Sequence, residues 1–107
     1  MIQRDPKSGT ADVKVTFLIP ADSVDEVTAV VGDFNGWDPS ATTFRRRSGQ
    51  WTASITVPRG RRYAFRYVSA DGSWFNDDEA DGYEPNPFGG HNCVLDLSEA
   101  EEAVAQR

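Results

Sequence analysis

The chain has few of the residues from which metal sites, redox sites and disulfides are built. Its 107 residues include one cysteine, Cys93, and one histidine, His91. A single thiol cannot form an internal disulfide, and no Cys-x-x-Cys motif or Cys/His cluster is present. We therefore expect no structural disulfide, no metal and no other cofactor, and a reducing, cytoplasmic location.

Long apolar runs are also missing. No segment approaches the roughly 20 consecutive apolar residues that a transmembrane helix requires. The first residues, MIQRDPKSGTADVK, lack the apolar core of a signal peptide. We therefore expect no membrane partner.

Basic charge is scarce overall, with 11 Lys and Arg against 17 Asp and Glu and a net charge of −6. This balance argues against a nucleic-acid partner, which requires a basic face. The charges are uneven, however, because residues 39–70 hold seven arginines and no acid, whereas residues 71–84 hold six acids and no base. Such runs are usually solvated surface, and they can also contact a partner of opposite charge.

Alternating apolar and polar residues predict several β-strands separated by turns. The strands are expected at 13–19, 27–31, 51–57, 62–69, 73–75 and 92–97. The same alternation turns Arg66 and Asn92 away from the core side of their strands. No long helical pattern precedes residue 98, so the sequence predicts an all-β fold, a small antiparallel sandwich.

The domain organisation follows from these strands. We expect a flexible N-terminal arm at 1–11, the β-sandwich at 12–97 and a C-terminal tail at 98–107. In the tail, Ser98 and Glu101 have the spacing of a helix capping box, which predicts a short helix.

The tryptophans lie in different settings. Trp51 alternates in phase with the apolar residues of its strand, which predicts a core position. Trp37 lies between two turn-forming dipeptides, NG at 35–36 and DP at 38–39, which places it at the end of a sheet. It either folds back as a plug over the sandwich end or faces outward, where a ligand completes its burial.

Trp74 has a similar setting, two residues after the Asp71-Gly72 turn and before an acidic stretch. Two such indoles suit a sugar, because a pyranose ring has an apolar C–H face that packs on an indole. The ring's hydroxyls need donors and acceptors, and amides such as that of Asn92 supply both, whereas the Arg66 guanidinium supplies donors only.

Three segments together resemble carbohydrate-binding module family 48. They are VVGDFNGWDP at 30–39, YAFRYVSADGSWFND at 63–77 and PNPFGGHNCVLDL at 85–97. This family includes the early-set N-terminal domains of isoamylases and glycogen-branching enzymes and the glycogen-binding domain of the AMP-activated protein kinase β subunit. The resemblance covers about residues 12–97 and implies an immunoglobulin-like (early-set) antiparallel β-sandwich.

The resemblance also implies a function, the non-catalytic binding of α-glucan such as glycogen, starch or malto-oligosaccharide. In glycogen-binding members two tryptophans stack on glucose rings, and these match Trp37 and Trp74. A lysine and an asparagine that contact sugar match Arg66 and Asn92, with arginine in place of lysine. Further candidate sugar contacts are Asn35 and His91. No catalytic barrel follows in the sequence, so we expect a stand-alone domain.

A second function class stays open, a protein-interaction adaptor on the same fold that does not bind sugar. Many enzyme-linked members of the family serve as structural neighbours of a catalytic barrel, and the segment GYEPNPFGGHN at 82–92 is more similar to theirs than to that of the kinase members. The segments that would contact a partner protein are the arginines at 45–47, the acidic loop and the C-terminal tail.

Catalysis and metal binding are the less favoured alternatives. The stretch DDEADG at 77–82 has carboxylates at alternate positions like a calcium loop, but its twelfth position is Phe88 rather than glutamate. His91 has no partner at a recognisable triad spacing, and a sandwich of this size lacks a deep cleft for a carboxylate pair. We therefore predict that the domain is not an enzyme.

Overall fold

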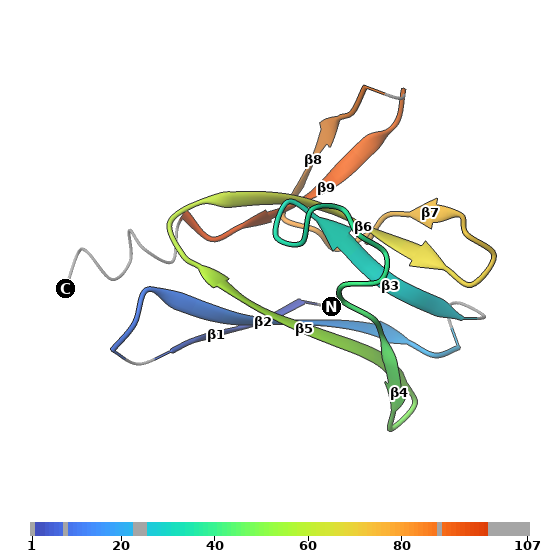
Figure 1. Ribbon diagram of the computed structural model, residues 1–107, viewed down its shortest axis with the longest axis horizontal. Helices are drawn as coiled ribbons and strands as arrows, with labels where there is room; N and C mark the ends of the chain where they lie inside the picture. The colour runs from blue at the N-terminus through green and yellow to red at the C-terminus, as the bar shows by residue number, and fades with distance from the viewer. Residues whose placement is uncertain (1, 8, 23–25, 88, 99–107) are drawn as a thin grey trace.

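Two antiparallel β-sheets pack face to face in the computed structural model (Figure 1). The structure describes residues 2–7, 9–22, 26–87 and 89–98. The strands are β1 (Ile2–Pro6), β2 (Asp12–Pro20), β3 (Val27–Gly32), β4 (Arg45–Arg47), β5 (Gln50–Pro58), β6 (Arg62–Ser69), β7 (Trp74–Phe75), β8 (Gly82–Pro85) and β9 (His91–Asp96). The predicted all-β antiparallel sandwich is confirmed.

The strand order is that of an immunoglobulin constant-type domain. One sheet has the order β1-β2-β5-β4, and the other has the order β3-β6-β9-β8, with β7 also pairing with β6. In the immunoglobulin fold the two sheets are ABED and CFG. Strands β1, β2, β5 and β4 take the places of A, B, E and D, while β3, β6 and β9 take those of C, F and G.

The core lies between the sheets and is built from the alternating residues that the sequence indicated. The inward side of β2 is fully or almost fully buried, as is that of β6 opposite. These residues are Val13, Val15, Phe17, Ile19, Tyr63, Phe65 and Tyr67. Phe17 is central, since its ring lies 5.2 Å from that of Phe65 and 6.1 Å from that of Tyr67, measured between centroids. Trp51 packs against this cluster with partial burial.

The N-terminal segment, for which the sequence predicts a flexible arm at 1–11, contains strand β1. Strand β1 pairs antiparallel with β2, in a register that places Ile2 opposite Phe17. Ile2 packs against the core, so apolar burial contributes to holding β1 at the sheet edge. The local sequence does not reveal this strand, because its pairing depends on contacts with residues distant in sequence.

Strand β4 consists of three arginines and was likewise not expected. It forms because the turn at Ser48 and Gly49 has φ of 52° and 77°, the conformation of a two-residue type I′ hairpin. The turn returns the chain along β5, with Arg46 opposite Trp51. Charged residues on an edge strand also discourage pairing with other chains.

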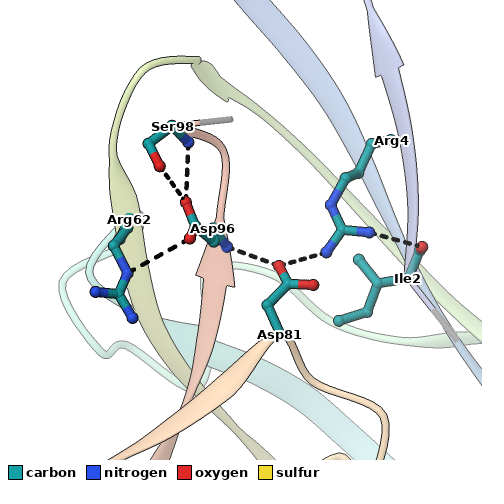
Figure 2. Close-up of polar contacts among 6 residues, drawn as sticks. All are labelled: Ile2, Arg4, Arg62, Asp81, Asp96 and Ser98. Atoms are coloured by element: carbon teal, nitrogen blue, oxygen red, sulfur yellow. Dashed lines mark hydrogen bonds and ion pairs between the residues drawn. The ribbon is translucent and has the colours of Figure 1, made fainter. Parts of the chain in front are cut away.

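A polar network ties β1 to the end of β9 across the two sheets (Figure 2). Arg4 Nη2 forms an ion pair with Asp81 Oδ2 at 2.5 Å, and the same oxygen accepts a hydrogen bond from the Asp96 backbone N–H at 2.7 Å. The Asp96 carboxylate in turn accepts hydrogen bonds from the Ser98 N–H and hydroxyl. These bonds, led by the Ser98 hydroxyl, lower the pKa of Asp96.

The C-terminal tail was expected to form a short helix. Apart from Ser98, that segment lies outside the described residues. Within the described part of the chain, no helix has the length and apolar character required to cross a membrane.

Candidate functional site

The loop after β3 presents Trp37 in an unusual backbone conformation. The Gly32 carbonyl accepts hydrogen bonds from the N–H groups of Asn35 and Trp37, at 3.1 and 3.0 Å. This tight turn places both Gly36 and Trp37 in the left-handed region, with φ of 67° and 61°. Glycine adopts that region freely, whereas a bulky aromatic residue there costs on the order of 1–3 kcal/mol. The surrounding contacts must offset this strain.

Asn35 supplies several of these contacts. Its Oδ1 accepts a hydrogen bond from the Gly32 N–H at 3.0 Å. Its Nδ2 donates to the Val30 carbonyl at 3.0 Å and to the Thr42 hydroxyl at 3.1 Å. The amide is therefore engaged inside the loop, and Asn35 does not line the pocket that Trp37 lines.

Asp33 fixes the side chain of Trp37. The indole Nε1–H donates to Asp33 Oδ1 at 3.2 Å. The other carboxylate oxygen, Oδ2, accepts from the Ala64 N–H on β6 at 2.9 Å. The carboxylate thus links the loop that carries Trp37 to a central strand of the sheet.

Trp74 approaches from the β6–β7 hairpin. At its turn Asp71 Oδ1 accepts hydrogen bonds from the Ser69 hydroxyl and from the Ser73 hydroxyl and N–H, which together lower the pKa of Asp71 to about 2. Gly72 has a φ of 88°, as this tight turn requires. Beyond the turn, Trp74 pairs with Val68, and 41% of its surface is exposed.

The two indoles stack against each other. The Trp37 and Trp74 rings lie within 3° of parallel, with centroids 6.1 Å apart. The perpendicular gap between parallel planes cannot exceed the distance between their centroids. A sugar ring inserted between them would need about 7 Å, since each carbon contact takes about 3.5 Å. A sugar therefore has to lie on the outward side of the pair, not between the rings.

The predicted site residues gather around one open pocket of about 440 Å³. Its lining includes Trp37, Trp74, Arg66, Asn92, Asp33 and Glu84. The structure thus brings the first four, which the sequence singled out, to the same pocket. His91 is exposed and does not line it, although its carbonyl accepts a hydrogen bond from Asn76 nearby.

Arg66 is held in place before any ligand binds. Its Nε donates to Asn76 Oδ1 at 2.8 Å, and its Nη2 donates to the Trp74 carbonyl at 3.3 Å. The guanidinium carbon lies 6.0 Å from the centre of the Trp74 ring, which is within range of a cation–π interaction. The remaining nitrogen, Nη1, makes no hydrogen bond to a described residue and is available to a ligand.

The β8–β9 hairpin contributes pocket residues that sequence reasoning missed. Glu84 lies opposite Asn92 in the register of the two strands. Asn86, also in the lining, donates from Nδ2 to Asn92 Oδ1 at 3.3 Å and accepts the Gly90 N–H at 3.1 Å. The PNP sequence at 85–87 signals a loop, but only the pairing of β8 with β9 shows that Glu84 and Asn86 lie beside Asn92.

The acidic cluster after β7 lies outside this pocket. Carboxylate oxygens of Asp77, Asp78 and Glu79 are within 4.8 Å of one another. Asp77 is buried, and its two oxygens accept hydrogen bonds from the Tyr67 hydroxyl and the Glu79 N–H, both at 2.7 Å. Burial, followed by the nearby Asp77 charge, raises the pKa of Tyr67. Asp77 thus anchors this loop to the core.

Comparison with known proteins gives both a family and relatives. The family model described as "Carbohydrate-binding module 48 (Isoamylase N-terminal domain)" matches residues 7–84. Two curated relatives are "1,4-alpha-glucan branching enzyme GlgB 2" of Xanthomonas campestris pv. campestris, from strains 8004 and ATCC 33913. Each is 48% identical over 48 aligned residues, and the match covers 41% of this chain and 6% of the relative. The alignment therefore covers a small part of those enzymes.

Proposed function

The chain belongs to the carbohydrate-binding module 48 family, and from this premise we propose that it is a non-catalytic module that binds α-glucan as a stand-alone domain. The observation that carries the proposal is the pair of parallel indoles, Trp37 and Trp74, at one pocket. The early-set immunoglobulin-like sandwich provides the rigid support for it. The names of the matched relatives support an α-glucan as the ligand class.

Apolar contact on the indoles is the first part of the proposed mechanism. The C–H face of a glucose unit covers the exposed ring of Trp74, and a neighbouring unit covers Trp37, so that water leaves both surfaces. Each contact contributes little free energy after the cost of association is subtracted. Useful affinity therefore comes from an oligosaccharide that contacts both rings at once.

Hydrogen bonds to the sugar hydroxyls are the second part. Arg66 presents Nη1 as a donor from a fixed position, because Asn76 and the Trp74 carbonyl hold the rest of its guanidinium. The Asn92 amide offers a donor as well as an acceptor. Both side chains are preorganised, which reduces the entropy lost on binding.

Electrophoresis in native gels that contain glycogen tests the proposal. We expect wild-type protein to be retarded relative to a glycogen-free gel, and Trp37→Ala and Trp74→Ala each to migrate as in the glycogen-free gel. Quenching or shift of tryptophan fluorescence on addition of maltoheptaose gives a second reading. Equal mobility of wild type and both variants, with no retardation of any, would contradict α-glucan binding.

The adaptor hypothesis keeps one specific observation in its favour. Arg45–Arg47 are all exposed on the edge strand β4, and none forms an ion pair with a described residue. A pull-down that recovers a stoichiometric partner, insensitive to excess maltoheptaose and lost when these arginines are replaced by glutamine, would support it. Recovery that maltoheptaose abolishes would instead favour the glucan site.

A further inference from the structure

We propose that Asp33 is a positioning residue that orients the Trp37 indole. The proposal rests on the function above for its biological role, but its structural part can be tested without sugar. Three hydrogen bonds carry it. The Asp33 N–H donates to the Ala64 carbonyl at 3.0 Å, Asp33 Oδ2 accepts the Ala64 N–H at 2.9 Å, and Asp33 Oδ1 accepts the Trp37 indole N–H at 3.2 Å.

The first two bonds anchor Asp33 to the sheet. Backbone and side chain of Asp33 both pair with Ala64, directly beyond the point where Gly32 pairs with Phe65. A Cβ added at Gly32 would lie 2.5 Å from the Ala64 carbonyl oxygen, so the loop leaves β3 in close contact with β6. The Asp33 carboxylate is therefore held by a rigid strand through Oδ2, and its other oxygen, Oδ1, accepts the indole N–H.

The third bond favours one orientation of the Trp37 side chain, which also stacks on Trp74. Trp37 is only partly buried and stands in a loop with left-handed backbone. A partly exposed ring in such a place can occupy several rotamers. The bond from Nε1 favours the rotamer in which the ring lies within 3° of parallel to Trp74. Asp33 thus stabilises the parallel arrangement of the two indoles.

A carboxylate is the group that this position requires. Two N–H donors, from Ala64 and Trp37, each meet a different oxygen of Asp33. Asparagine has one acceptor oxygen and an NH₂ donor, so one of the two N–H groups would face another donor. With the oxygen retained by Ala64, the indole N–H loses its acceptor and the ring is released.

Indole N–H signals in ¹H–¹⁵N NMR spectra test the structural part without sugar. In Asp33→Asn we expect the Trp37 indole resonance to move upfield and its proton to exchange faster with water. The Trp51 indole N–H is buried and donates to no residue that the structure describes, and its resonance serves as an internal reference that should stay in place. An unchanged Trp37 resonance in Asp33→Asn overturns the proposal, whether or not the protein binds glucan.

Asp38→Asn is the matched control, because the same substitution is made in the same loop. Asp38 Oδ1 accepts hydrogen bonds from the N–H and hydroxyl of Ser40 and has no bond to Trp37. We expect this variant to keep the Trp37 resonance and to bind maltoheptaose within twofold of wild type. A shift equal to that of Asp33→Asn would mean that any charge change in the loop moves the indole, and would overturn the specific role of Asp33.

A double-mutant cycle tests the role in binding. Asp33→Asn should weaken maltoheptaose binding about three- to tenfold, the effect of one lost hydrogen bond. Trp37→Phe keeps an aromatic ring but removes the indole donor, so adding Asp33→Asn to it should cause no further loss. If Asp33→Asn weakens maltoheptaose binding equally in wild type and in Trp37→Phe, Asp33 contacts the sugar itself. That result would overturn its role as a positioning residue. If wild type fails to bind maltoheptaose while the NMR shift is seen, the proposed function fails and the orienting role stands.

Discussion

The Trp37 and Trp74 indoles lie within 3° of parallel, although one follows β3 and the other begins β7. Each depends on a tight turn with positive φ, at Gly36–Trp37 in one case and at Gly72 in the other. Each turn is held by a short polar side chain: Asn35 Oδ1 accepts the Gly32 N–H, and Asp71 Oδ1 accepts the Ser73 N–H. The stacked pair of indoles is therefore a product of two local turn conformations brought together by the pairing of β6 with β3 and β7.

Strain at Trp37 leads to the first prediction. Glycine adopts a φ near 61° without cost, whereas alanine retains the clash of a Cβ in the left-handed region. We expect the free energy of unfolding of Trp37→Gly to equal that of Trp37→Ala or to exceed it by up to about 1 kcal/mol. Both variants should lose glucan retardation, so stability and binding separate at this position. Urea denaturation measures the difference, and a Trp37→Ala variant clearly more stable than Trp37→Gly would contradict the strain.

Arg66 should contribute to affinity through its free Nη1. Replacement by methionine keeps most of the aliphatic stem and removes all donors, so we expect maltoheptaose affinity to fall about tenfold or more, as for a charge-assisted hydrogen bond. Arg46→Met on β4, in the other sheet, is the matched control and should bind like wild type. Isothermal titration calorimetry measures both, after circular dichroism has shown that each variant folds. Unchanged affinity in Arg66→Met would remove Arg66 from the proposed site.

The site could be predicted from sequence where local patterns determine it. Alternation turns Arg66 and Asn92 outward, and turn dipeptides place Trp37 and Trp74 at strand ends. Glu84 and Asn86 depend instead on the register of β8 with β9, which no local pattern reveals.

Other differences between the sequence-based predictions and the structure have local as well as long-range causes. Asn35 and His91 do not line the pocket. The Asn35 amide forms its hydrogen bonds within its own loop, and the contact of His91 near the pocket is made by its backbone carbonyl, which accepts a hydrogen bond from Asn76. Strand β1 requires the distant pairing of Ile2 with Phe17, and β4 follows from a turn rather than from its three arginines. Long-range pairing thus decides β1, whereas local hydrogen bonds decide the position of Asn35 and a local turn decides β4.

Acid should weaken the β6–β7 hairpin through Asp71. Its pKa in the folded protein is about 2, below its ordinary value of 3.8, because three hydrogen bonds favour the charged form. A lowered folded pKa stabilises the fold above the unfolded pKa, and this stability is lost as the pH falls from about 4 to about 2. We expect Asp71→Asn, which keeps an acceptor oxygen without the charge, to show a smaller loss of stability over that range. Denaturation curves at several pH values compare the two proteins, and identical slopes would rule out Asp71 as a contributor.

Strand β1 should behave as part of the sheet. Hydrogen exchange is expected to show protected amides in β1, unlike an unpaired arm. Arg4→Ala should lower the free energy of unfolding by up to about 1 kcal/mol, since its ion pair with Asp81 is partly exposed. Asp81→Ala should cost more, because Asp81 Oδ2 also accepts the Asp96 N–H (Figure 2). Amides that exchange at the rate of an unfolded peptide would restore the picture of a flexible arm.

Ligand length should decide affinity, because the gap between the indoles is too narrow for a sugar ring. With centroids 6.1 Å apart, the pair offers an outward surface and not a slot, so one glucose unit cannot pack against both rings face to face. We expect glucose to bind too weakly to detect, and affinity to rise from maltose to longer malto-oligosaccharides until both indoles are covered, then to level off. In Trp37→Ala we expect no detectable binding along the series, since one remaining ring contributes too little free energy. Calorimetric titration with the oligosaccharide series measures this, and glucose binding as tightly as maltoheptaose would show that the sugar enters a single closed subsite instead.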